Sequence, residues 1–193
     1  AGKYGVDATR LFLVSAASPE KDILWSEAGV EGSHRFINKV VEKFKKIKIG
    51  KSNAKTEHKI NKAIKKITDQ VENFKYNFAT IELRKFFDCV EEEISKEDIE
   101  SFLKMFSVFC PHIGEELWSK LGNKDFVSLS EWPKYDDKKI DEKFDRAEQI
   151  VEKTVSDILN ILRIVKEKQN KEANKIYLYI LPNEKEVYSE DEL

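Results

Sequence analysis

The sequence predicts a mainly α-helical protein whose helices pack as an antiparallel bundle. Apolar residues recur at alternating steps of three and four along several segments, which is the spacing of one buried helix face. The 193 residues include only 7 Gly and 4 Pro, while 40 % are hydrophobic and 36 % are charged. This composition is typical of a soluble, helix-rich protein with short loops, and the chain is long enough to bury a core.

The first predicted helix lies near the N-terminus. Asp7 is a candidate N-cap, and Leu11, Phe12 and Val14 would give the helix one apolar face. Pro19 would end this segment because proline cannot donate a helical hydrogen bond.

The second predicted helix begins at Ser26, whose hydroxyl can accept a hydrogen bond from a first-turn amide. Trp25 is expected to pack against Val30, one turn into the helix, as a hydrophobic staple. Gly29 and Gly32 would let another backbone approach closely. The expected buried face consists of Val30, Ser33, Ile37, Val40, Phe44 and Ile47.

A turn is predicted at residues 49–53, and a long apolar stripe follows it. A helix break within residues 76–81 would divide this stripe into two helices, and the periodicity leaves both possibilities open. The stripe consists of Ile60, Ile64, Ile67, Val71, Phe74, Phe78 and Ile81.

Two more helices are predicted from local start and stop signals. Ser95 and the acidic residues after it resemble a capping box, and the helix that they begin would run to Pro111. A last helix of the bundle would start at Pro111 and end at Gly122.

The C-terminal part is predicted to be a charged linker, a helix and a strand. Apolar residues from Ala147 to Val165 indicate the helix, and residues 176–181, rich in β-branched and aromatic side chains, indicate the strand. One strand does not form a stable sheet by itself. We therefore expect residues 134–193 to begin a truncated α/β domain.

Positive charge is concentrated between Arg35 and Lys66. This segment contains 12 Lys or Arg and only two acidic residues, so it carries +10 while the rest of the chain carries −12. Such segregation is typical of contact with a polyanion, and nucleic acid is the first candidate. A solvated lysine-rich face would give the same pattern, so charge does not separate the two interpretations.

The candidate binding residues come from two predicted helices and one aromatic side chain. Phosphate contacts from lysine and arginine position a nucleic acid without reading its sequence. The two sets of cations would share one surface if their helices paired antiparallel, which the short loop between them favours. Trp25 could stack on an exposed base. The predicted nucleic-acid-binding residues are Arg35, Lys39, Lys43, Lys46, Lys59, Lys62, Lys66 and Trp25.

The sequence offers no catalytic or metal-binding motif. No nucleophile is paired with a base, and no glycine-rich loop is present to hold phosphate. Cys110 and His112 are too few for a zinc site, which needs about four ligands. Two cysteines, the lack of a long apolar run and an N-terminus unlike a signal peptide predict a cytoplasmic protein with no membrane contact.

Several motifs occur in a fixed order along the chain. They are Tyr4-Gly5-x-Asp7-x-x-Arg10, Lys21-Asp22-x-x-Trp25-Ser26, Gly29-x-x-Gly32-x-x-Arg35-Phe36, Pro111-His112-Ile113-Gly114-Glu115-Glu116-Leu117-Trp118 and Ser130-Glu131-Trp132-Pro133. This series resembles leucyl-tRNA synthetase, a class I enzyme, just downstream of its catalytic domain. The C-terminal pattern is similar to that of the archaeal-type enzymes.

The resemblance implies a helical bundle of the class I anticodon-binding type. Residues 1–24 would connect to a missing catalytic domain, residues 25–133 would form the tRNA-binding bundle with Trp132 capping it, and residues 134–193 would start the C-terminal domain. The parent enzyme would use ATP and Mg²⁺ to attach leucine to tRNA(Leu), with no cofactor held by this fragment. The other expected partners are the catalytic and editing domains of the same chain, in a monomer.

Two alternatives stay open. The fragment could be the equivalent region of a valyl- or isoleucyl-tRNA synthetase. It could also be a helical protein-interaction module whose basic face meets an acidic partner.

Overall fold

The computed structural model describes residues 2–169 and 175–181, and these contain seven α-helices, two short strands and two 3-10 turns. The chain divides into two compact units, Ala1–Ile140 and Asp141–Leu193. The predicted mainly helical fold is confirmed.

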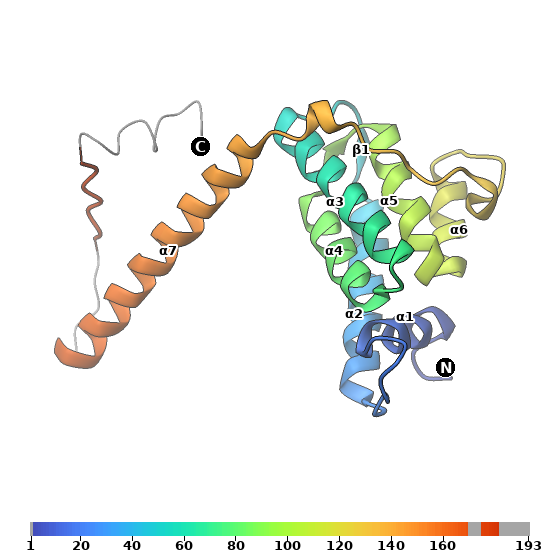
Figure 1. Cartoon of the computed structure of the whole chain (residues 1–193), viewed down its shortest axis with the longest axis horizontal. Coiled ribbons are helices and arrows are strands. Elements are labelled where there is room, and N and C mark those ends of the chain that lie inside the picture. Colours follow the sequence, from blue (N-terminus) through green and yellow to red (C-terminus); the bar gives the residue numbers. More distant parts are fainter. Residues whose placement is uncertain (1, 170–174, 182–193) are drawn as a thin grey trace. The chain divides into compact units, whose positions relative to one another are not determined.

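The first unit is a bundle of six helices in which neighbours in sequence often pack together (Figure 1). α1 packs on α2 and α4, α3 packs along α4, and α5 packs on α6. The helices are α1 (Val6–Ala16), α2 (Glu27–Phe44), α3 (Ala54–Glu72), α4 (Tyr76–Cys89), α5 (Lys96–Phe109) and α6 (Pro111–Lys120).

Phenylalanine rings from three helices form the centre of the core. Phe102 of α5 stacks on Phe106 with 5.4 Å between ring centroids, and the Phe86 ring of α4 meets Phe102 at 5.6 Å. Phe36 of α2 contacts Phe87 edge-on at 5.7 Å. All five side chains are buried. Such aromatic pairs add to the stabilisation that burial of their area already provides.

Side-chain caps fix where three helices begin. Ser26 Oγ accepts from the Gly29 amide at 3.1 Å, and Ser95 Oγ accepts from the Asp98 amide at 3.1 Å, as predicted. Asn53 Oδ1 accepts from the Thr56 amide at 2.8 Å at the start of α3. Each cap satisfies an amide that has no partner inside its own helix, which stabilises by about 1 kcal/mol.

The long apolar stripe is divided into α3 and α4, so the break left open by the periodicity is present, but at residues 73–75 and not within residues 76–81. α3 ends at Glu72 and α4 starts at Tyr76. Between them Phe74 has a positive φ of 57°. The expectation that Phe74, Phe78 and Ile81 are core residues is wrong, because all three are exposed.

α4 buries a different set of residues because the turn at Phe74 changes the helix axis and the rotation of its faces. Its buried residues are Ala79, Thr80, Leu83, Phe86 and Phe87.

A short parallel pairing was not predicted. β1 (Lys48–Ile49) lies beside β2 (Glu93–Ile94), so that the connection after α2 is bonded to the connection after α4. Gly50 continues this contact: its amide donates to the Ile94 carbonyl at 3.0 Å. A Cβ at Gly50 would lie 2.6 Å from the Glu93 Cδ, so the exposed Glu93 side chain would have to move to make room for it.

The N-terminal segment differs from the sequence prediction in two contacts. Gly5, not Asp7, is the N-cap of α1, and Asp7 lies buried in the first turn. Trp25 contacts the Phe12 ring edge-on at 5.5 Å, where a staple to Val30 was expected. A Cβ at Gly29 would meet Phe12 as well, so this glycine makes room for a side chain and not for a backbone.

The chain after α6 returns along the bundle through the turns η1 (Val127–Leu129) and η2 (Asp137–Lys139). Trp132 packs against the core, and its Nε1 donates to Thr68 Oγ1 of α3 at 2.8 Å. This indole closes the surface between α3 and the returning segment.

The second unit contains α7 (Glu142–Gln169), which confirms the predicted C-terminal helix. The strand expected at residues 176–181 is not formed: the described residues 175–181 are neither helix nor strand. A strand needs a hydrogen-bonded neighbour strand, and the sheet formed by the described residues consists of β1 and β2. Residues 170–174 and 182–193 of the expected C-terminal domain lie outside the described residues.

Candidate nucleic-acid interface

The α2 cations have acidic or carbonyl partners in the bundle. Arg35 pairs with Glu31 one turn earlier at 2.8 Å, and Lys39 pairs with Asp88 of α4 at 2.7 Å. Lys43 donates to the Phe87 carbonyl at 3.3 Å and lies over the ring of that residue. Lys39 and Lys43 therefore both meet the last turn of α4.

This position gives Lys39 and Lys43 a structural role. The C-terminus of a helix carries partial negative charge and unpaired carbonyls, which lysine side chains stabilise. Burial lowers the pKa of Lys43, and the charge of Lys39 lowers it further. Lys46 is exposed, and together with Lys39 and Lys43 it lines a shallow depression whose other walls are Glu42 and Glu92.

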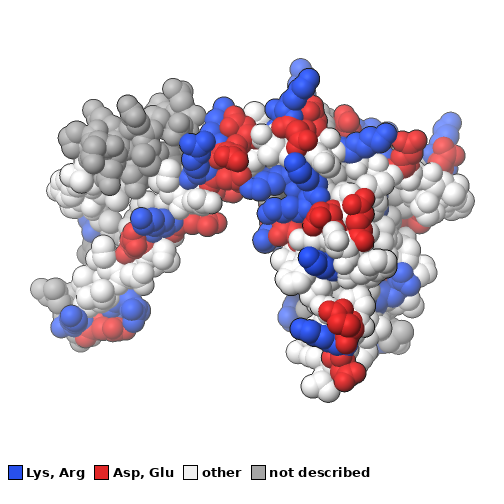
Figure 2. All heavy atoms as spheres, viewed as in Figure 1, with Lys and Arg blue, Asp and Glu red and all other residues white. Residues whose placement is uncertain are grey.

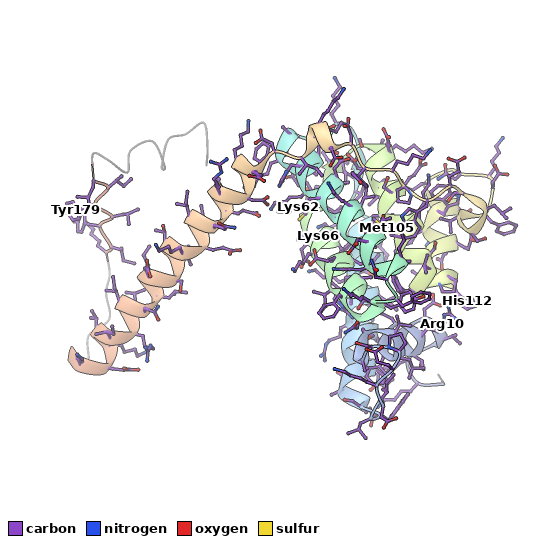
Figure 3. The ribbon with its side chains drawn as sticks, viewed as in Figure 1. Arg10, Lys62, Lys66, Met105, His112 and Tyr179 are labelled. Carbon is purple, nitrogen blue, oxygen red and sulfur yellow. The ribbon has the colours of Figure 1, made fainter. Side chains whose placement is uncertain are left out.

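The α3 cations lie along one side of their helix. Lys59, Lys62 and Lys66 are spaced by three and four residues, which places them on neighbouring turns of one face. Figure 2 shows a gathering of Lys and Arg over α3, and Figure 3 shows Lys62 and Lys66 extending from the same side of this helix. Lys66 approaches Glu82 of α4 at a long 3.8 Å. We call Lys59, Lys62 and Lys66 the α3 ridge.

Acidic residues flank the α3 ridge. Lys65 pairs with Asp137 at 2.8 Å, and Lys139 pairs with Glu57 at 3.0 Å. These ion pairs join α3 to the η2 turn. The strong positive charge of residues 35–66 in the sequence is therefore partly balanced in space by carboxylates from other segments.

The predicted site residues lie on two helices whose main packing partners differ. α3 packs along α4, and α2 packs against α1, so the predicted antiparallel pairing of α2 with α3 is not the main packing of either helix. We describe the cations as two basic areas, one on α2 beside the end of α4 and one on the α3 ridge. Trp25 lies apart from both sets in sequence, and its side chain is 62 % exposed beside Phe12.

Sequence reasoning missed an aromatic group at the α3–α4 turn. Phe74 is 66 % exposed, and its ring meets that of Tyr76 at 6.0 Å. The turn is a Schellman motif: the Lys75 amide donates to the Gln70 carbonyl at 2.7 Å and the Phe74 amide to the Val71 carbonyl at 3.1 Å. Glycine usually occupies the left-handed position of this motif. A large residue at the end of a stripe, just before a break, was the only signal for it.

Other chemistry has little support in the part of the chain that the structure describes. No cluster of three His, Cys, Asp or Glu side chains suited to a metal ion occurs among the described residues. No helix within those residues has the length and hydrophobicity to cross a membrane. His112 is engaged with Asp7, and Cys110 is buried, which raises the pKa of its thiol.

A family model described as the anticodon-binding domain of tRNA ligase matches residues 53–178. The chain belongs to this family. The match extends from the N-cap of α3 through the end of the bundle and α7, and it agrees with the helical architecture.

Curated relatives of this chain include leucine--tRNA ligases of bacteria. The enzyme of Rickettsia bellii is 36 % identical over 149 residues, which cover 70 % of this chain and 18 % of the relative. The enzyme of Prochlorococcus marinus strain NATL1A is 38 % identical over 155 residues, covering 69 % of this chain and 18 % of the relative. This chain therefore spans less than a fifth of their length. The expected archaeal-type subclass finds no support among them.

A solved structure shares the fold. It is the agnB2 LeuRS of Agrobacterium radiobacter K84, determined as a ternary complex with tRNA and LeuAMS. The alignment has a TM-score of 0.59 at 19 % identity and covers 72 % of this chain and 20 % of that protein.

Proposed function

We propose that this chain is the anticodon-binding-type domain of a leucine-tRNA ligase and that it positions tRNA(Leu). The similarity to leucine--tRNA ligases over about 70 % of the chain carries the proposal. The leucyl assignment is preferred over the valyl and isoleucyl alternatives because the relatives named above are leucine enzymes. The ligation of leucine to tRNA, with its ATP and Mg²⁺, belongs to parts of the ligase outside this chain.

We place the principal tRNA contact on the α3 ridge. Lys59, Lys62 and Lys66 project along one side of a single helix, as a row of phosphates requires. On α2, Lys39 and Lys43 both lie at the last turn of α4, beside the carboxylate of Asp88. Lys46 and Arg35 then supply secondary contacts, and Trp25 remains a candidate for stacking on a base.

The test is the binding of tRNA(Leu) by the 193-residue chain at several salt concentrations. Reversing Lys59, Lys62 and Lys66 to Glu should weaken binding at low salt by about tenfold or more. It should also reduce the slope of log affinity against log salt by about two to three, since each lost phosphate contact lowers the slope by about one. The same reversal at Lys39 and Lys46 should have a smaller effect.

Lys120 and Lys124 provide a matched control, because both are exposed lysines outside the two basic areas. Their reversal to Glu changes the net charge as much as the reversal of Lys39 and Lys46 does, by one reversal less than in the ridge variant, and should leave the salt slope nearly unchanged. Equal binding by the ridge variant and the unmodified chain at low salt would exclude the ridge. Equal binding of tRNA and an acidic protein by the unmodified chain would favour the protein-interaction module.

A further inference from the structure

The α3–α4 turn combines three features that the phosphate contacts do not use. Phe74 holds a left-handed backbone conformation that large side chains rarely adopt. Its ring is 66 % exposed although the sequence pattern places it in the core. Two side-chain oxygens nearby in sequence, Gln70 Oε1 and Asn77 Oδ1, are buried without a hydrogen-bond partner. Strained, exposed and unsatisfied groups tend to gather at functional sites.

The turn lies at the end of the α3 ridge. Asn73 follows Lys66 by seven residues, or two helical turns, so the face that carries Lys59, Lys62 and Lys66 continues to the C-cap. Phe74 comes next. A chain of phosphates that continues past Lys66 along this face would therefore reach the turn that carries Phe74.

The chemistry of the turn suits an unpaired base. Proteins hold single-stranded nucleic acid by combining a basic track for the backbone with exposed aromatic rings on which bases stack. Asp69, on the same face of α3, carries a carboxylate that accepts from Asn73 Nδ2 at 3.1 Å. This carboxylate disfavours a phosphate at the turn, and it is an acceptor for the amino group of a base.

We propose that Phe74 is a stacking platform for one unpaired base of an RNA whose phosphates lie along the α3 ridge. The inference rests on the proposed function, since it extends the RNA contact beyond the three lysines. It differs from that function because it requires an unpaired base, whereas phosphate contacts accept paired and unpaired RNA alike.

The test compares a 12-nucleotide single-stranded RNA with an RNA duplex of the same length, each titrated into the 193-residue chain. Phe74→Ala should weaken binding of the single strand by about fivefold or more, which is the usual effect of losing one stacked base. Its effect on the duplex should be small. Phe74→Tyr should restore single-strand binding, and Phe74→Leu should not, because a leucine keeps the apolar surface without a π face.

Phe126 is a matched control because its side chain is also 66 % exposed and it precedes η1, outside the α3–α4 turn. Phe126→Ala should bind both RNAs like the unmodified chain. Circular dichroism of each variant establishes that the helices are intact, and Phe74→Tyr keeps the test valid if Phe74→Ala loses structure.

Single-strand binding that is equal for Phe74→Ala and the unmodified chain would overturn the platform, as would full binding by Phe74→Leu. If the lysine reversals abolish RNA binding and Phe74→Ala does not change it, the proposed function stands and the stacking platform fails. If neither the lysine reversals nor Phe74→Ala changes RNA binding, the α3 ridge of the proposed function is overturned together with the stacking platform that depends on it.

Discussion

The carboxylate of Asp7 lies 2.8 Å from Nδ1 of His112, which connects the first turn of α1 to the first turn of α6. The other carboxylate oxygen accepts from the Ile113 amide, also at 2.8 Å. Asp7 is only 6 % exposed, whereas the His112 side chain is 71 % exposed. Removal of Asp7 therefore takes away the partner of a backbone amide, whereas removal of His112 takes away a partner that is exposed to water.

Asp7→Ala should lower the free energy of unfolding by about 2 kcal/mol, because it leaves the Ile113 amide without its partner in a partly buried position. His112→Ala should cost about 1 kcal/mol or less, since water can replace an exposed partner. Urea denaturation of both variants checks the order. A larger loss for His112→Ala would mean that the imidazole, and not the amide, is the important partner.

Gly29 and Gly32 form a matched pair on α2. A Cβ at Gly29 would lie 2.7 Å from Cδ2 of the buried Phe12 ring, while the atom nearest to a Cβ at Gly32 is Arg35 Nη2 at 3.9 Å. Gly32→Ala should stabilise by about 0.5–1 kcal/mol through helix propensity. Gly29→Ala should destabilise by about 1–3 kcal/mol through overpacking. Thermal unfolding measures both changes, and stabilisation by both would show that Phe12 moves aside freely.

Phe74→Gly should stabilise the fold, in contrast to most substitutions of a large apolar residue. A left-handed conformation costs a residue with a Cβ about 1–2 kcal/mol, and glycine avoids this cost. The exposed ring loses little burial on removal. We expect an increase of about 1 kcal/mol in the free energy of unfolding by denaturant titration. A clear decrease would mean that the contact with Tyr76 outweighs the backbone strain.

Lys43 should make stability depend on pH in the alkaline range. Its pKa is lowered in the folded state, chiefly by burial, so the unfolded chain binds the proton more readily. The lysine therefore disfavours folding below its folded pKa, and this effect is relieved as pH rises from that value toward the ordinary lysine pKa. Lys43→Met removes the dependence. The measurement is the free energy of unfolding of the variant and of the unmodified chain, at neutral pH and near the ordinary lysine pKa. The difference between the two proteins should be smaller at the higher pH.

Local chemistry predicted the helix boundaries well. Ser26 and Ser95 cap their helices, Pro111 starts α6 and Gly122 follows it at a positive φ of 86°, because each of these signals acts within one turn of the chain. The helical fold class follows from the same local periodicity. Phe78 and Ile81 were predicted in the core but are exposed, because a seven-residue repeat identifies one helix face only while the helix axis continues, and the axis changes at Phe74.

The candidate site was harder to predict because its partners are distant in sequence. Asp88 and Asp137, which pair with Lys39 and Lys65, belong to α4 and to the returning segment. The positions of Lys59, Lys62 and Lys66 on one helix face could be read from their spacing. Whether that face lies beside the cations of α2 depends on how the helices pack against one another. The spacing of residues along one helix gives no information about this packing.

The pairing of β1 with β2 has a consequence for chain connectivity. The chain enters the α3–α4 hairpin at Lys48 and leaves it at Glu93, and these two residues are direct partners. The two ends of the α3–α4 hairpin therefore lie next to each other in the bundle. A short linker could join the end of α2 to the start of α5 across this pairing, so the length of the hairpin can change while the remaining helices stay connected.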